Sequence, residues 1–186
     1  EKNVGKTTLL NKLIADIGIN KKLGLTSIGR DGEDIDVVTN TDKPRIYVRR
    51  GSIIATGKNC LAKCDITKEI LYVTDFTTPM GSIVIVRALS DGYVDIAGPS
   101  YNKQVKIVVE LMEKFGSEVS IVDGALGRKS TAISDVSEAT ILSTGAALSL
   151  DMLKVVEETK KTVYFLKLDE AEKNIKEKVE KLRNEK

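Results

Sequence analysis

The tetrapeptide GKTT at residues 5–8 constrains the fold of this chain most, because it stands directly before an apolar helical stripe. A glycine at this point lets main-chain amides approach an anion closely, and the start of a helix adds a partial positive charge. An ordinary capped helix start has the same composition, so the fragment alone leaves both interpretations open. The stripe predicts a helix over residues 8–17 and consists of Leu9, Leu10, Leu13, Ile14 and Ile17.

The next part of the chain favours β structure. Residues 22–29 predict a short strand that runs into a polar turn. Several segments within residues 45–98 are rich in Ile, Val and Tyr, which is typical of strands. The turn residues of Leu89–Tyr93 (LSDGY) predict a hairpin between two of these strands.

After Ser100 the pattern alternates between helix and strand. Alternation of this kind predicts a mostly parallel sheet covered by helices on both faces. We expect one domain over residues 1–186. Its later elements are helices at 102–115 and 150–160, strands at 119–123, 139–145 and 162–168, and a charged C-terminal helix at 169–186.

The start of the chain matches most of a Walker A loop, G-x-x-x-x-G-K-[ST]. The segment EKNVGKT supplies every position except the first glycine, which would fall one residue before Glu1. The strand that leads into such a loop would precede Glu1 as well. Lys6 is expected to reach the β- and γ-phosphate oxygens, and the Thr7 hydroxyl to ligate Mg²⁺. The residues expected to bind the nucleotide are Asn3, Val4, Gly5, Lys6, Thr7 and Thr8.

A second motif supports nucleotide binding. P-loop proteins place an aspartate at the end of a buried strand, where it holds Mg²⁺ through water, and Asp123 follows the apolar segment VSIV in this way. The alternative is a strand-end aspartate that begins a turn. Together the motifs predict an α/β fold similar to P-loop NTPases, a three-layer sandwich with a mostly parallel sheet and a β-rich central insertion.

The acidic turn GRDGED at residues 29–34 follows the first predicted strand. Asp31, or less favourably Glu33, is a candidate for meeting Mg²⁺ or orienting an attacking water. A solvated acidic turn is the alternative. Lys6, Asp31 and Asp123 are thus the candidate catalytic residues, and Thr7, Asp31 and Asp123 the candidate metal ligands.

The identity of the base depends on a late motif. Guanine-specific proteins place [NT]-K-x-D after a late strand, and LKLD at Leu166–Asp169 lacks the polar first residue. ATP is therefore expected ahead of GTP.

Composition excludes several other classes. The chain has no histidine, which removes Ser-His-Asp and Cys-His nucleophiles and imidazole metal ligands. A net charge of +2 gives no reason to expect nucleic acid or an anionic membrane as a partner. Cys60 and Cys64 are expected to pack in the interior, and two cysteines without a disulfide framework suggest a reducing, cytoplasmic setting.

The motifs EKNVGKTTLLN, LTSIGRDGEDIDVVT, IAGPS, VDGALGR and ATILSTGAALS occur in this order. In this arrangement the chain resembles the ATP-binding reactivase components associated with adenosylcobalamin-dependent lysine 5,6-aminomutase and D-ornithine aminomutase. The resemblance extends from Glu1 to about Leu168. The family carries its nucleotide site on the positions of Gly5, Lys6, Thr7 and Asp123.

The resemblance implies a helper protein that uses ATP to open an inactivated mutase and admit intact cofactor. Its implied partners are the aminomutase and a second reactivase subunit, with Mg²⁺ as the metal. The missing first glycine and lead strand depart from the family pattern. Two alternatives stay open: an ATP-dependent biosynthetic enzyme similar to dethiobiotin synthetase, and a GTPase switch protein.

Overall fold

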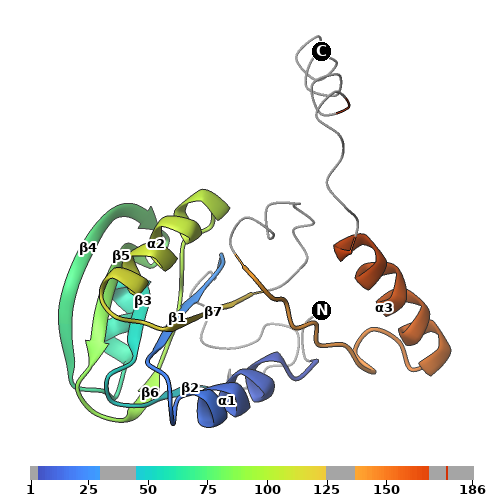
Figure 1. Cartoon of the computed structure of the whole chain (residues 1–186), viewed down its shortest axis with the longest axis horizontal. Coiled ribbons are helices and arrows are strands. Elements are labelled where there is room, and N and C mark those ends of the chain that lie inside the picture. The colour runs from blue at the N-terminus through green and yellow to red at the C-terminus, as the bar shows by residue number, and fades with distance from the viewer. Residues whose placement is uncertain (1–3, 30–44, 125–136, 168–174, 176–186) are drawn as a thin grey trace. The chain divides into compact units, whose positions relative to one another are not determined.

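The computed structural model describes residues 4–29, 45–124, 137–167 and 175. They fall into two compact units, residues 1–143 and residues 144–186 (Figure 1). No helix in the described part of the chain is long and apolar enough to cross a lipid bilayer. Nearly all of the predicted C-terminal helix lies outside the described residues.

The larger unit is built on a five-stranded sheet with the strand order β4-β5-β3-β1-β7. β1 lies parallel to both of its neighbours, β3 and β7, whereas β5 pairs antiparallel with β3 and with β4. The predicted α/β class is confirmed, but the sheet is mixed, because β4 and β5 extend the parallel strands as an antiparallel pair. The strands are β1 (Leu23–Ser27), β3 (Ile53–Gly57), β4 (Lys68–Thr78), β5 (Gly81–Ala88) and β7 (Val119–Asp123).

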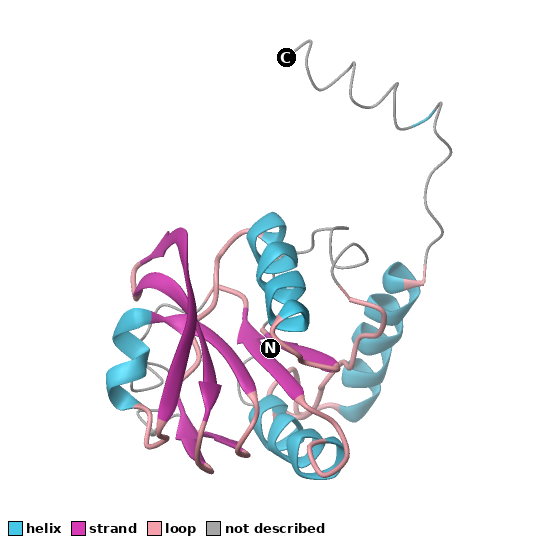
Figure 2. Ribbon diagram, turned by 60° about the vertical axis from the view of Figure 1, so that its left-hand side comes forward, coloured by secondary structure: helices cyan, strands magenta, loops and turns pink. Residues whose placement is uncertain are grey.

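Separate hydrophobic cores lie on the two faces of this sheet, under helices α1 (Lys6–Ile17) and α2 (Asn102–Lys114). The alternation along β3 shows the division, since Ile54 packs in the α1 core and Ile53 in the α2 core. The two helices lie on opposite sides of the strands in Figure 1, and the strands fan out as a twisted sheet in Figure 2. The buried helical residues are Leu10 and Ile14 in α1 and Val105, Val108 and Met112 in α2.

A small antiparallel sheet of β2 (Ile46–Val48) and β6 (Gly92–Val94) contributes to the α1 core. Residues 45–98 are rich in strands as predicted, but they are not an insertion, because β3, β4 and β5 belong to the main sheet and only β2 and β6 lie outside it. Asn11 ties this small sheet to α1: its Oδ1 accepts a hydrogen bond from the Tyr47 amide at 3.2 Å, and its Nδ2 donates to the Arg45 carbonyl at 3.2 Å.

Some local predictions are wrong. LSDGY does not close a hairpin, because β6 pairs with β2 and not with β5. Residues 139–145 form no strand. Residues 162–166 of the strand predicted at 162–168 instead form the end of helix α3 (Met152–Leu166), and Leu168 lies outside the described residues. Asp151 caps this helix by accepting a hydrogen bond from the Leu153 amide at 2.9 Å, and no glycine or proline interrupts the helix before its end.

The cysteines pack as predicted. Cys60 lies in a short 3₁₀ helix, Lys58–Lys63, and is fully buried. The Cys64 thiol donates a hydrogen bond to the Cys60 carbonyl at 3.2 Å, and burial raises its pKa. A raised pKa keeps a thiol protonated at neutral pH, so Cys64 has the character of a packing residue.

Candidate functional site

Helix α1 begins directly after a glycine in the left-handed conformation. Gly5 has φ 76° and ψ 17°, and no side chain caps the helix there. A Cβ on Gly5 would have no atom within 4 Å, so the backbone conformation, and not crowding, requires glycine. The Gly5 carbonyl accepts the first intrahelical bond, from the Leu9 amide at 2.9 Å. The amide groups of the first turn of α1 point past the N-terminus of the helix, where an anion can accept hydrogen bonds from them.

The start of α1 lies toward the carboxyl ends of the parallel strands. Residues 18–22 form a tight turn, in which the Asn20 and Lys21 amides both donate to the Ile17 carbonyl at 3.1 Å. After this turn β1 runs back along α1, and Leu10 and Leu23 share one core. Ligands of open α/β sheets bind at this carboxyl end, in the crevice where the strand order reverses.

β1 and β7 end side by side at this edge. Ser27 pairs with Asp123, and the Ile28 amide donates to the Asp123 carbonyl at 2.8 Å, which extends the ladder past the strand end. Gly124 keeps the chains close, because a Cβ there would collide with Ile28 Cγ2. β7 thus carries the half-buried Asp123 side chain to the sheet edge toward which Lys6 also lies.

Hydroxyl groups that the sequence analysis missed hold residues 95–99 across the ends of β1 and β3. Ser27 Oγ accepts from the Gly98 amide at 2.9 Å and donates to the Ile96 carbonyl at 3.3 Å. Thr56 Oγ1 accepts from the Ala97 amide at 2.9 Å and donates to the Asp95 carbonyl at 3.1 Å.

Gly98 belongs to the same arrangement. A Cβ at this position would overlap the Ser27 carbonyl oxygen, so only glycine permits the approach. The sequence signal was a polar residue at the end of each apolar strand, in GLTS and IIATG. The buried hydroxyls of Ser27 and Thr56 both form hydrogen bonds with main-chain groups. Their role is therefore to hold residues 95–99 in place at this edge of the sheet.

A carboxylate at the opposite end of the strands fixes α1 relative to β7. Glu118 accepts a hydrogen bond from the Lys22 amide at 2.9 Å and from Lys21 Nζ at 3.0 Å. The bond from the Lys22 backbone, followed by that from Lys21, lowers the pKa of Glu118, so the carboxylate stays ionised at neutral pH. Since residues 21–22 connect α1 to β1, this contact holds the helix that carries Lys6 in register with the strand that carries Asp123.

The structure describes most, but not all, of the predicted site residues. Lys6 and Thr7 are half-buried in the first turn of α1, Val4 is half-buried before it, and Thr8 is exposed. Asn3, Asp31 and Glu33 lie outside the described residues.

The described residues contain no cluster of three or more His, Cys, Asp or Glu that could hold a metal ion. A metal at this edge would have few protein ligands. Mg²⁺ fits such a site, because it keeps several waters and takes one or two protein oxygens together with phosphate oxygens. The Thr7 hydroxyl and the Asp123 carboxylate are oxygen ligands of the required kind.

The LKLD motif lacks the structural context that base recognition needs. Leu166 is the last residue of α3 and Lys167 its C-cap, so the motif follows a helix and not a strand. Asp169 lies outside the described residues. The described structure gives no support to guanine recognition by this motif.

Comparison of the chain with protein-family models, with curated proteins and with solved structures finds no match to any of them.

Proposed function

We propose that this chain binds Mg-ATP at the carboxyl end of β1 and β7, and that it serves as a reactivating helper for an adenosylcobalamin-dependent amino acid aminomutase. The observation that carries nucleotide binding is the left-handed Gly5 directly before α1, at the end of the sheet where β7 delivers Asp123. A glycine with free space around it, an adjacent lysine and a helix start together form an arrangement suited to phosphate.

Each residue has a distinct role in this proposal. The main-chain amides at Gly5, Lys6 and Thr7 donate to phosphate oxygens, and the Lys6 ammonium neutralises the β- and γ-phosphates. The Thr7 hydroxyl contacts Mg²⁺ directly, and Asp123 contacts it through water. Bound Mg²⁺ would supply charge neutralisation at the phosphates. Asp31 is retained as the candidate that orients an attacking water.

The helper role rests on the resemblance of the sequence motifs to aminomutase reactivases. In this role ATP acts as a switch, since its γ-phosphate stabilises one state of the protein that engages the mutase. Apart from Mg-ATP and the mutase, no further small-molecule substrate is then needed for turnover.

The test is an ATPase assay with and without an adenosylcobalamin-dependent lysine or ornithine aminomutase. We expect the mutase to stimulate ATP hydrolysis, and this chain together with ATP and intact adenosylcobalamin to restore activity to mutase that carries damaged cofactor. Turnover that depends instead on a small acid or amine would contradict the helper role and favour a biosynthetic enzyme. Faster turnover of GTP than of ATP would contradict the choice of nucleotide.

Replacement of Gly5 separates phosphate binding from backbone strain. Gly5→Ala and Gly116→Ala both place a Cβ at positive φ, 76° and 102°, where no atom lies within 4 Å. Each is expected to lower the free energy of unfolding by about 1–2 kcal/mol. Only Gly5→Ala is expected also to weaken Mg-ATP binding, because only Gly5 precedes the phosphate-binding amides. Urea unfolding and calorimetric titration measure the two effects, and equal ATP affinities in the two variants would contradict the site.

A further inference from the structure

The side chain of Asn11 takes the place of a neighbouring strand on the edge of β2 that lies opposite β6. β2 pairs with β6 along its other edge. Asn11 Nδ2 donates to the Arg45 carbonyl and Asn11 Oδ1 accepts from the Tyr47 amide, both at 3.2 Å. These two main-chain groups flank Ile46, and a parallel strand would bond the same pair. Such a contact needs a donor and an acceptor on one side chain, which the asparagine amide provides.

The start of β2 is itself firmly held. Arg45 forms an ion pair with Asp65 at 2.6 Å, and its Nη2 donates to the Lys63 carbonyl at 2.7 Å. Its guanidinium carbon also lies 5.6 Å from the centre of the Tyr93 ring. Because the planar guanidinium makes all three contacts at once, they fix its orientation together. The main chain that Asn11 binds is therefore a rigid reference for α1.

α1 needs a directional contact of this kind to fix its position along its own axis. Leu10 and Ile14 bury the helix in the α1 core, but hydrophobic burial is non-directional. The Glu118 contact holds the turn that follows α1, and by itself it leaves the helix able to pivot about that end. Asn11 adds a second fixed point, about 7.5 Å along the axis from Lys6. With both contacts the first turn of α1 is held in place.

We propose that Asn11 is a positioning residue for the phosphate site, because its bonds to β2 hold α1 where the Lys6 ammonium and the first-turn amides meet the phosphates. This inference rests on the proposed function. Asn11 acts through α1 and does not itself contact the nucleotide. Misplacement of functional groups by about 1 Å can cost about a hundredfold in activity, so a small shift of the helix is enough to weaken the site.

Asn11→Leu tests the proposal in the full chain, since leucine is similar in size and forms neither hydrogen bond. We expect calorimetry to show Mg-ATP binding weakened about three- to thirtyfold, the range typical of residues that act on a site through the structure. The matched control is Thr74→Val on β4. Thr74 Oγ1 also bonds two main-chain groups, because it donates to the Ile83 carbonyl at 3.0 Å and accepts from the Phe76 amide at 3.2 Å.

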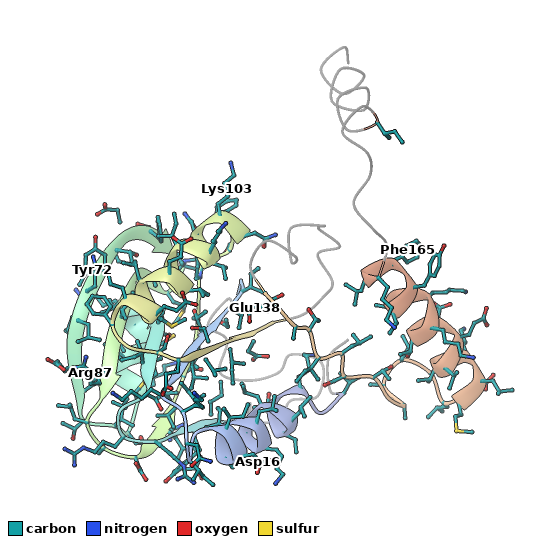
Figure 3. All side chains as sticks on the ribbon, in the orientation of Figure 1. Asp16, Tyr72, Arg87, Lys103, Glu138 and Phe165 are labelled. Carbon is teal, nitrogen blue, oxygen red and sulfur yellow. The ribbon has the colours of Figure 1, made fainter. Side chains whose placement is uncertain are left out.

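The control separates a positioning role from a general loss of stability. Each variant removes two bonds between a side chain and the main chain, and urea unfolding should show that both lower the free energy of unfolding. Only Asn11→Leu should weaken Mg-ATP binding, because β4 lies at the opposite edge of the sheet from β7. Figure 3 shows Tyr72 of β4 at this outer edge, well apart from Asp16 on α1. Equal affinities in the two folded variants would overturn the proposal.

Hydrogen exchange of the unmodified chain gives a measurement that needs no variant. Coupling between two sites is reciprocal, so if the Asn11 bonds favour nucleotide binding, bound Mg-ATP must stabilise those bonds. The Tyr47 amide, which donates to Asn11, should therefore exchange more slowly at saturating Mg-ATP relative to the Phe76 amide. An unchanged ratio would overturn the proposal, even where Asn11→Leu does not fold. An unmodified chain that binds no Mg-ATP would instead overturn the proposed function, and this inference with it.

Discussion

Replacing Lys6 with alanine is expected to weaken Mg-ATP binding about ten- to a hundredfold. A hydrogen bond to a charged group contributes about 1.5–3 kcal/mol, which corresponds to this range of dissociation constants. Lys6 is half-buried in the first turn of α1, so its ammonium would meet the phosphates where water screens the charge only partly. Isothermal titration calorimetry with Mg-ATP measures the change.

The matched control is Lys12→Ala in the same helix. Lys12 is exposed and forms an i, i+4 ion pair with Asp16 at 2.9 Å, more than one turn away from the helix start. Both variants remove one lysine from α1, so nonspecific attraction of the nucleotide falls equally in both. Only Lys6→Ala should lower the affinity markedly. An unchanged affinity in Lys6→Ala would remove the phosphate site and, with it, the proposed helper function.

Replacing Ile14 with alanine is expected to lower the free energy of unfolding by about 2–5 kcal/mol. Ile14 is 1% exposed and packs α1 against β1 and the small sheet. The loss has two parts, the transfer free energy of the deleted groups and the cavity that they leave. Since domains of this size are stable by about 5–15 kcal/mol in total, this one change would remove a large fraction of the stability. Urea denaturation followed by circular dichroism measures the change.

Ile19→Ala provides the comparison within the same chain. Ile19 follows Gly18, the C-cap of α1, and is 64% exposed, so its truncation should change the stability by no more than about 0.5 kcal/mol. Similar losses in the two variants would show that α1 is not packed on the sheet as described. The position of Lys6 relative to Asp123 would then lose its structural basis.

The elements that the sequence predicted correctly are those with a strong local pattern. The apolar stripes of α1 and α2 match the helical periodicity, and β3 begins with the β-branched residues Ile53 and Ile54. The strand-end position of Asp123 was likewise visible, because the apolar run of β7 stops at that residue.

The wrong predictions concern segments whose structure depends on other parts of the chain and not on their own residues. TVYFL at residues 162–166 has the β-branched and aromatic composition of a strand, yet a helix already started by the Asp151 cap continues through it. The pairing of β6 with β2 joins segments far apart in the chain. The turn residues next to β6 could not reveal it, because they report only on local conformation.

The sequence by itself determined that α1, β1, β3, α2 and β7 form in the larger unit, and that a lysine follows a glycine at the first helix start. These features depend on side-chain periodicity and backbone freedom, which are local properties. Only the tertiary structure decided that α1 starts at the sheet edge where Asp123 emerges, and that Ser27, Thr56 and Gly98 hold residues 95–99 across that edge. Each of these depends on which strands become neighbours, and that choice is made by burial of the two cores across the whole sheet, not by any single segment.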